Sequence, residues 1–174
     1  MARDNEEFTM IFNEHYPGLC RFLECMMSGR RDVAQEIVQE CFMRLYLMDE
    51  NELPVTQARF WLYRVARNLA LNELSRRQTH HRLSTRISEL FRRRTPDPEE
   101  NLEHEERGRI VLEMLKRLPE QQRAALLLRE QEEMSYREIA EVLKITESKV
   151  KVDIFRARSA MRSLWNDFVN APSG

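Results

Sequence analysis

The sequence predicts an all-α protein made of two small helical domains, an N-terminal one of three to four helices and a C-terminal one of four. Leu, Glu, Arg, Gln and Ala dominate the chain, and only four Gly and six Pro interrupt it, which favours helices over short strands. Charge is also uneven, because the basic segment 76–94 is followed directly by the acidic segment 97–106. Such a change of composition around two prolines is typical of a flexible linker. The expected divisions are a domain at 1–78, a linker at 79–100 and a domain at 101–174.

The composition excludes several classes of protein. No run of about 18 apolar residues is present, and the N-terminus, MARDNEEF, is too polar for a signal peptide, so a cytoplasmic protein without membrane insertion is expected. A Gly-rich phosphate loop, a nucleophile motif and metal-ligand spacing are also absent from the sequence, so we expect neither an enzyme nor a cofactor or metal. Cys20, Cys25 and Cys41 lie in apolar helical patterns and are expected to be buried reduced thiols.

The formal net charge of −1 limits how this chain can bind DNA. A protein that binds DNA unaided is usually clearly basic, because neutralising phosphates supplies most of the non-specific affinity. This chain is therefore expected to bind DNA weakly by itself and to need a larger assembly that holds it there.

The N-terminal domain is expected to begin with two helices. The first spans about residues 6–27, and Pro17 is expected to break or kink it. The second spans about residues 32–48, with Asp32 as its N-cap. One face of the second helix is apolar at helical spacing. Its opposite face carries Glu36, Gln39, Glu40 and Met43.

The third helix, at about residues 58–77, has a polar surface with one aromatic side chain. Four residues recur on it at steps of three and four, namely Trp61, Arg64, Asn68 and Asn72. Arg67 lies beside this 61–72 surface, and Arg76 and Arg77 extend it. One interpretation is a half-exposed Trp among solvated neighbours. The other is a nucleic-acid surface, because Trp stacks on unpaired bases, Arg pairs with phosphate and Asn reads base edges.

Four helices are expected in the C-terminal domain, at about 102–117, 119–131, 136–143 and from 147 onward. Ser135 and Glu138 have the spacing of a capping box at the start of the third of these helices. Thr146 is a suitable N-cap for the fourth. The bend between them is expected at Lys144 and Ile145.

The last helix has two faces. Apolar residues at intervals of three and four predict one continuous buried stripe, formed by Val150, Ile154, Ala157, Met161, Leu164 and Phe168. The opposite face collects Ser148, Lys149, Val152, Phe155, Arg156 and Ser159, with Lys151 beside it. A short capped helix, a bend and a basic helix are typical of a helix-turn-helix, whose second helix lies in the major groove.

Individual side chains of this face suit contacts with DNA. Arg156 and Lys149 suit guanine or phosphate, and Val152 suits the methyl group of thymine. Asp153 would repel a nearby phosphate unless Lys149, one turn earlier, neutralises it.

These segments resemble the extracytoplasmic-function (ECF, group 4) sigma factors, which are specificity subunits of bacterial RNA polymerase. The resemblance covers nearly the whole chain. FNEHYPGLCRFL is similar to the family's first helix, and RRDVAQEIVQECFMRLY is similar to its polymerase-docking helix. FWLYRVARNLALNELSRR resembles the helix that handles the −10 element, and the segment that begins LPEQQRAALLL resembles the −35-reading domain. The chain departs from the family pattern at Lys144, where Gly is frequent.

The resemblance implies partners for each surface. Core RNA polymerase, through the clamp coiled coil of its largest subunit, would contact Asp32, Glu36, Gln39, Glu40 and Met43. The −10 element would be engaged by Arg59, Trp61, Arg64, Arg67, Asn68, Asn72, Arg76 and Arg77. The −35 element would be bound by Ser148, Lys149, Lys151, Val152, Phe155, Arg156 and Ser159. The polymerase flap and an anti-sigma factor are further implied partners.

The expected function is therefore that of a non-catalytic sigma factor, which directs core polymerase to promoters and helps to open them. Two weak DNA-binding domains become selective when a larger enzyme sets their separation, because binding of the second site is then intramolecular. Two alternatives remain open. One is a helix-turn-helix repressor or activator that works without core polymerase, and the other is a helical adaptor with no DNA role.

Overall fold

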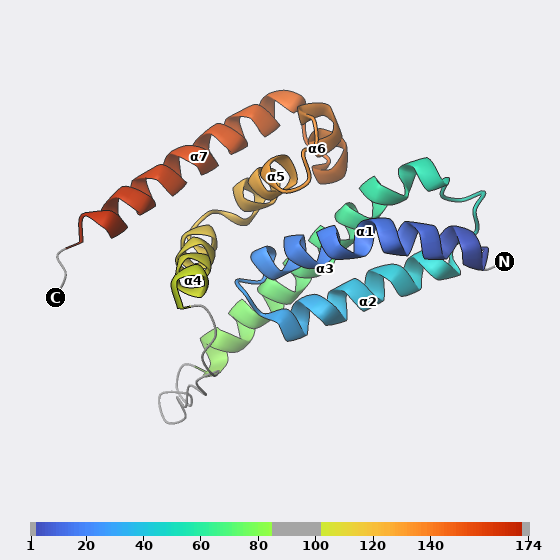
Figure 1. The fold of residues 1–174 in the computed structure, drawn as a ribbon, viewed down its shortest axis with the longest axis horizontal. Helices are drawn as coiled ribbons and strands as arrows, with labels where there is room; N and C mark the ends of the chain where they lie inside the picture. Colours follow the sequence, from blue (N-terminus) through green and yellow to red (C-terminus); the bar gives the residue numbers. More distant parts are fainter. Residues whose placement is uncertain (1–2, 85–101, 172–174) are drawn as a thin grey trace.

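The computed structural model describes residues 3–84 and 102–171, which contain three helices in the first range and four in the second (Figure 1). The helices are α1 (Asn5–Met26), α2 (Arg31–Leu47), α3 (Val55–Ser84), α4 (Leu102–Lys116), α5 (Glu120–Glu130), α6 (Tyr136–Leu143) and α7 (Glu147–Val169). Neither described range contains a strand, so the all-α prediction is confirmed. No helix in these two ranges has the length and apolar character that crossing a membrane requires.

Helices α1, α2 and α3 pack against one another and form the N-terminal module. Aromatic rings join α1 to α2, with the ring centroids of Phe12 and Phe42 4.8 Å apart and those of Phe8 and Tyr46 5.1 Å apart. A T-shaped contact at 5.4 Å between Phe22 and buried Tyr63 joins α1 to α3. Such contacts bury large apolar areas and favour one packing geometry, which holds α2 and α3 at set positions on α1.

Two sequence expectations for this module, a break of the first helix at Pro17 and an N-cap at Asp32, are wrong. Helix α1 is one continuous helix that contains the exposed Pro17, and it packs against both α2 and α3 (Figure 1). Packing on both sides of the proline compensates for the backbone hydrogen bond that Pro removes. Asp32 is not the N-cap of α2, since Arg30 occupies that position and makes no side-chain capping bond. Asp32 instead lies in the first turn, where its negative charge suits the helix dipole.

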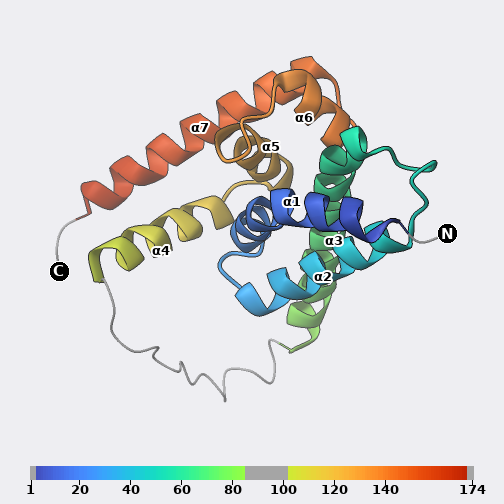
Figure 2. The same ribbon diagram turned by 45° about the vertical axis from the view of Figure 1, so that its right-hand side comes forward.

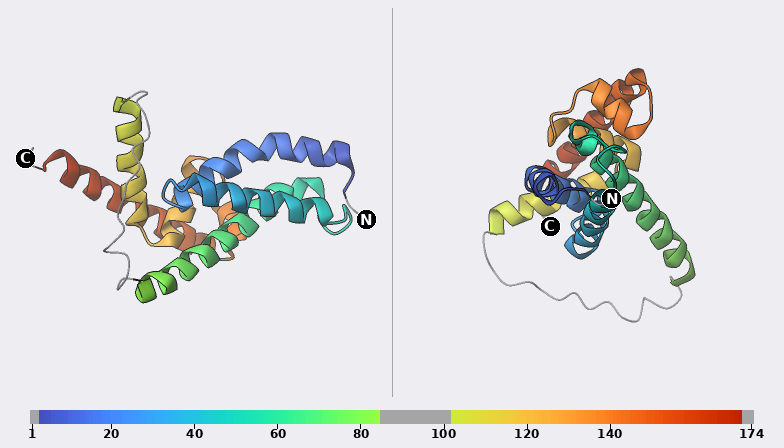
Figure 3. Two further views of the ribbon diagram at one scale, coloured as in Figure 1. Left: turned by 90° about the horizontal axis from the view of Figure 1, so that it is seen from below. Right: turned by 90° about the vertical axis from the view of Figure 1, so that its right-hand side faces the viewer.

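Helices α4 to α7 form the C-terminal module, in which α5 packs against both α6 and α7. The predicted buried stripe of α7 is correct only for its first half, where Val150, Ile154 and Ala157 are buried. Further along, Phe168 is 49% exposed, and Met161 and Leu164 are only partly buried. The reason is geometric, because the second half of α7 extends beyond α5 toward the C-terminus (Figure 3).

The two modules contact each other directly. Helix α6 packs beside the first turns of α3, and α1 packs against α4 and α5 (Figure 2). Arg123 of α5, 6% exposed, donates to the Met26 carbonyl at the end of α1 at 2.8 Å. The same guanidinium donates to the carbonyls of Lys116 and Leu118 at 3.1 and 3.2 Å. It thus satisfies carbonyls at the ends of α1 and α4 that the helices leave without partners.

The expected domain boundary at residue 78 falls inside α3, which continues to Ser84. The rest of the expected linker, from residue 85 to residue 100, lies outside the described residues.

Candidate nucleic-acid interface

The 61–72 surface lies along α3 and differs in exposure from one end to the other. Asn68 and Asn72 are exposed, whereas Trp61, Arg64 and Arg67 are partly buried. Further along the helix, Glu73 accepts from both neighbouring arginines, from Arg76 at 2.7 Å and from Arg77 at 2.6 Å. These two ion pairs offset part of the positive charge that the sequence placed there.

Three arginines of α3 point at the C-terminal module. Nη2 of Arg59 donates to the carbonyl oxygen of Glu132 at 2.5 Å. Nη2 of Arg64 donates to the carbonyl oxygen of Glu141, on α6, at 3.2 Å. Arg67 pairs with the Glu120 carboxylate on α5 at 3.4 Å. These arginines were predicted to hold DNA, and in this structure their guanidinium groups contact the other module.

The helix-turn-helix is formed by α6 and α7. Ser135 Oγ accepts from the Glu138 backbone N–H at 3.2 Å, and the Glu138 carboxylate accepts from the Ser135 N–H at 2.7 Å. This is the predicted capping box. Thr146 caps α7 as predicted, because its hydroxyl accepts from the Lys149 N–H at 3.2 Å. The bend between the helices is made by Lys144, whose φ of 56° lies in the left-handed region that glycine adopts at least cost.

The recognition face of α7 is accessible along its first half. All of its predicted residues except the partly buried Ser159 are exposed, namely Ser148, Lys149, Lys151, Val152, Phe155 and Arg156. Phe155 has the most exposed apolar ring among the described residues, at 68%, and Val152 on the same face is 42% exposed. An apolar group at such a position suits the thymine methyl that projects into the major groove.

Asp153 does not lie on the recognition face. Its side chain is 1% exposed and accepts from Lys149 Nζ and, at 3.1 Å, from Gln121 Nε2 on α5. The carboxylate therefore points into the module, away from any phosphate. Lys149 neutralises the Asp153 carboxylate, as predicted from their spacing of one turn. This pairing reduces the positive charge that Lys149 presents to DNA.

The predicted docking face of α2 is also accessible. Asp32, Glu36, Gln39 and Met43 are exposed, while Glu40 is partly buried and accepts from Arg44 Nε at 2.7 Å. A groove of about 320 Å³ runs at the surface between the packed helices α2 and α3. It is lined by Glu36, Ile37, Glu40, Leu69, Asn72, Glu73 and Arg76. Residues predicted for two different partners therefore share one groove.

Sequence reasoning missed the groups of the C-terminal module that face the α3 arginines. Glu120 and Glu132 bring carboxylates to Arg67 and Arg59, and Glu141 offers its backbone carbonyl to Arg64. A local pattern carries no information on such contacts, because these acceptors lie far along the chain from α3.

Comparison with known proteins assigns both modules. Residues 11–80 match the family model described as Sigma-70 region 2, and residues 108–161 match the model described as Sigma-70, region 4. The chain is 29% identical to the ECF RNA polymerase sigma factor SigM of Bacillus subtilis, over 95% of this chain and 97% of that protein. It is 30% identical to the ECF RNA polymerase sigma-E factor of Haemophilus influenzae, over 92% of this chain and 88% of that protein.

A solved structure shares the fold over most of the chain. It is the sigma factor RpoE of Bartonella quintana, in a co-crystal with the anti-sigma factor NepR. The match has a TM-score of 0.69 at 20% identity and covers 92% of this chain and 98% of RpoE.

Proposed function

This chain belongs to the ECF sigma factors of bacterial RNA polymerase, and we propose that three of its helical surfaces divide the work of starting transcription. As a member of that family it is a non-enzymatic subunit that directs transcription initiation. It acts in the cytoplasm, where the polymerase and its promoters are. The individual contacts follow from what each surface can do chemically.

Core polymerase binds the exposed face of α2, through Asp32, Glu36, Gln39, Glu40 and Met43. The supporting observation is that this face combines carboxylates with two exposed apolar side chains, Met43 at 59% and Leu47 at 68%. An exposed apolar side chain within a charged rim is typical of a protein interface. The acidic residues make a basic, partly apolar helical surface the complementary partner.

The 61–72 surface, with Arg59, Arg76 and Arg77, engages the −10 element as it opens. Trp61 stacks on an unpaired base, and the arginines contact phosphates. The first half of α7 binds the −35 element in the major groove, through the exposed residues from Ser148 to Arg156 and the partly buried Ser159. One observation supports both DNA contacts: the same chain has a capped helix-turn-helix and, on α3, a surface with Trp61 among arginines.

An anti-sigma factor is the proposed inhibitory partner. A related sigma factor of the same fold is bound to one in its solved structure. In this chain a groove of about 560 Å³ between α4 and α7 offers apolar side chains, Ile110, Met114, Leu164 and Phe168, flanked by charged ones. Purification of the chain from its native cells, followed by mass spectrometry of what accompanies it, is expected to find polymerase subunits and one small inhibitor.

Transcription in vitro tests the proposed function. Core polymerase with this chain is expected to start RNA at defined positions on genomic DNA, whereas core polymerase alone does not. Glu36→Lys is expected to abolish capture by core polymerase. The control is Glu14→Lys, which makes the same charge change at an exposed position of α1. Tight sequence-specific DNA binding without polymerase would favour a repressor or activator. Unchanged activity of Arg156→Ala would favour an adaptor.

A further inference from the structure

Arg3 is a buried charged residue that lies outside every surface of the proposed function. Its side chain is 0% exposed, although it stands only two residues before α1 begins at Asn5. Burying a guanidinium costs free energy unless protein acceptors replace the water that it loses. The acceptors of Arg3 therefore indicate which part of the fold this charge holds.

The guanidinium of Arg3 joins the start of α1 to residues 48–54, which connect α2 to α3. Nη2 donates to the carbonyl oxygen of Leu53 at 2.6 Å, and Nη1 pairs with the carboxylate of Glu7 in the first turn of α1. Leu53 is itself only 5% exposed, so water competes little for this hydrogen bond. A hydrogen bond with a charged donor is also stronger than one between neutral groups.

Two further hydrogen bonds attach residues 3 and 4 to the same region. The backbone N–H of Arg3 donates to the Tyr46 carbonyl at the end of α2, at 3.1 Å. The backbone N–H of Asp4 donates to the Glu50 carboxylate, also at 3.1 Å. Figure 1 shows the start of α1 beside the α2–α3 connection. Residues 3 and 4 thus hold the connection and the end of α2 at three points, Tyr46, Glu50 and Leu53.

The connection also contains hydrogen bonds of its own. The backbone N–H groups of Glu52 and Leu53 donate to the Asp49 carbonyl at 3.0 and 3.2 Å. The Asn51 N–H donates to the Asp49 carboxylate at 3.0 Å. These bonds give the turn its local shape. The bonds from residues 3 and 4, together with the buried Leu53 side chain, fix that turn to the helices of the module.

The connection leads directly into the 61–72 surface of α3. Gln57 is exposed and lies one turn before Trp61 on the same face of the helix, and Asn51 in the connection is exposed as well. Amide side chains such as these both donate and accept hydrogen bonds. An unpaired strand that stacks on Trp61 therefore has the connection as its next neighbour along α3.

We propose that Arg3 is a positioning residue for promoter opening, which holds the α2–α3 connection in the shape that receives the unpaired strand. This inference rests on the proposed role of the α3 surface and adds to it a residue outside α3. A connection that is fixed beforehand loses little conformational entropy when the strand binds, whereas a released one has to be ordered at that moment. Arg3 is buried, so it acts through Leu53 and not by touching DNA.

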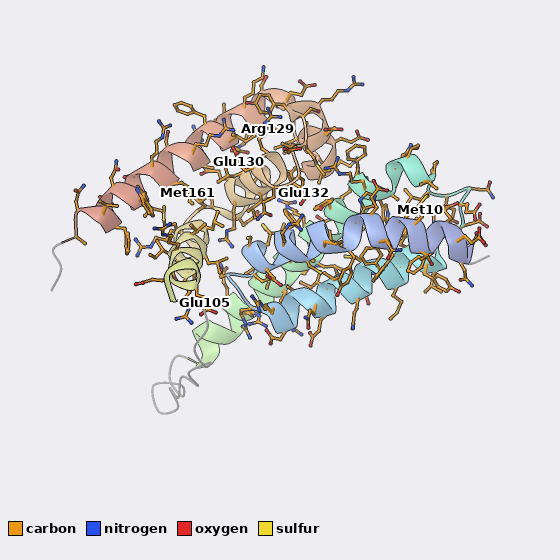
Figure 4. The ribbon with its side chains drawn as sticks, in the orientation of Figure 1. Met10, Glu105, Arg129, Glu130, Glu132 and Met161 are labelled. Atoms are coloured by element: carbon orange, nitrogen blue, oxygen red, sulfur yellow. The ribbon has the colours of Figure 1, made fainter. Side chains whose placement is uncertain are left out.

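Hydrogen–deuterium exchange of full-length Arg3→Met tests the structural part, because Met keeps apolar volume and removes the guanidinium. Arg21→Met, at an exposed position of α1, loses the same charge and is the matched control. Met10→Ala is the control for position, since Met10 is 51% exposed on the same half of α1 (Figure 4). Exchange of the amides in 48–54 is expected to accelerate about 10-fold or more in Arg3→Met alone, with the centre of α3 unchanged in all three variants.

DNA binding by the holoenzyme supplies the functional readout. The probe is a single-stranded oligonucleotide with the non-template −10 sequence of a promoter mapped by transcription in vitro, and a duplex with the −35 sequence of that promoter is the reference. Arg3→Met is expected to lower affinity for the oligonucleotide about 10-fold, as for ordering roughly one residue again. Affinity for the duplex and capture by core polymerase are expected to stay unchanged, whereas general damage to the fold would lower all three.

A pair of variants at exposed Glu50 supplies a second test without a buried change. Glu50→Ala removes the acceptor of the Asp4 N–H, and Glu50→Gln loses the same charge but keeps an acceptor oxygen. Affinity for the oligonucleotide is expected to be about 3-fold lower in Glu50→Ala than in Glu50→Gln, as for one lost hydrogen bond.

Equal exchange of 48–54 in Arg3→Met and Arg21→Met would overturn the proposal, and so would equal affinity of these two variants for the oligonucleotide. A loss of equal size for oligonucleotide and duplex would also overturn it. If circular dichroism shows that Arg3→Met does not fold, the Glu50 pair decides, and equal affinities within that pair then refute the proposal. A wild-type holoenzyme that does not bind the oligonucleotide would instead count against the proposed function, while the exchange result stands by itself.

Discussion

Lys149 and Asp153 form an ion pair one turn apart on α7, with the carboxylate 1% exposed and the ammonium at the surface. Gln121 of α5 donates to the same carboxylate, so Asp153 connects the recognition helix to the helix behind it. Asp153, whose charge is unfavourable for DNA binding, thus has a structural role in the fold.

Asp153→Ala is expected to lower the free energy of unfolding by about 1–3 kcal/mol, because Gln121 loses its acceptor and α7 loses a tie to α5. Urea denaturation followed by circular dichroism measures the change. Asp167→Ala, at an exposed position near the end of the same helix, is the control and is expected to change stability by less than about 0.5 kcal/mol. Equal effects at both positions would show that the connection contributes nothing.

Lys144→Gly is expected to raise the free energy of unfolding by about 0.5–1 kcal/mol. Lys144 has a φ of 56°, where a Cβ atom costs roughly 1–2 kcal/mol, and the greater freedom of Gly in the unfolded chain offsets part of the gain. Thermal unfolding measures the difference. Lys144→Ala keeps the Cβ atom and is expected to match the wild type, so stabilisation by both variants would assign the effect to the lost charge.

Arg156→Ala is expected to weaken binding at the −35 element by about 1–3 kcal/mol without changing capture by core polymerase. The reason is that Arg156 is exposed on the recognition face and suits guanine or phosphate. Promoter affinity of the assembled holoenzyme is the measurement. Arg162→Ala removes the same charge beyond this face and is the control. A loss of equal size in both variants would contradict a specific −35 contact.

Protonation of His15 is expected to destabilise the fold in mild acid. Burial lowers its pKa below the usual 6.5, the nearby Glu14 and Glu132 carboxylates oppose this shift, and Arg59 adds to it. Below pH 6.5 the unfolded chain binds more protons at His15 than the folded chain does. The free energy of unfolding is therefore highest above pH 6.5 and falls as the pH drops toward the lowered pKa. Denaturation midpoints between pH 5 and pH 8 measure this slope. His15→Gln is expected to flatten it, and an unchanged slope would assign it to other groups.

The thiol of Cys41 is expected to resist alkylation in the native state. It is 0% exposed, and burial raises its pKa to about 12, so little thiolate forms at pH 8. Iodoacetamide labelling read by peptide mass spectrometry is expected to modify partly buried Cys20 first and Cys41 only in urea. Labelling of Cys41 at the same rate in both states would show that α2 separates from α1 readily.

Local features were predictable from the sequence, and long-range ones were not. The Ser135–Glu138 capping box and the Thr146 cap depend on backbone groups three residues away, so their spacing was sufficient evidence. The prediction of Asp32 as an N-cap was wrong because an Asp in the first turn of a helix gives the same sequence pattern as an Asp at the cap itself. The prediction that Phe168 is buried was wrong because helical spacing shows which face of a helix a residue occupies and not how far the neighbouring helix extends.

The sequence was sufficient to predict which residues of α2 and α7 are exposed, and it was not sufficient to predict which residues of the two modules contact each other. The exposed residues of α7 and α2 followed from helical periodicity, because each lies opposite a buried face of its own helix. The contact of Arg59 with Glu132 joins residues from separate modules, and no periodicity relates them. Gly18 of α1 leaves space for the Glu132 carboxylate, and this contact could not be predicted from the sequence either, because a single Gly in a helical segment has many explanations.

The groove shared by α2 and α3 has a consequence for genetics. Glu36 and Glu40 on one wall face Asn72 and Arg76 on the other, so a protein seated on the first wall and a melted strand held by the second would be immediate neighbours. The enzyme surface would then form part of the chamber in which the strand is held. Substitutions in α2 would be recovered as promoter-melting defects even where assembly with the enzyme is intact.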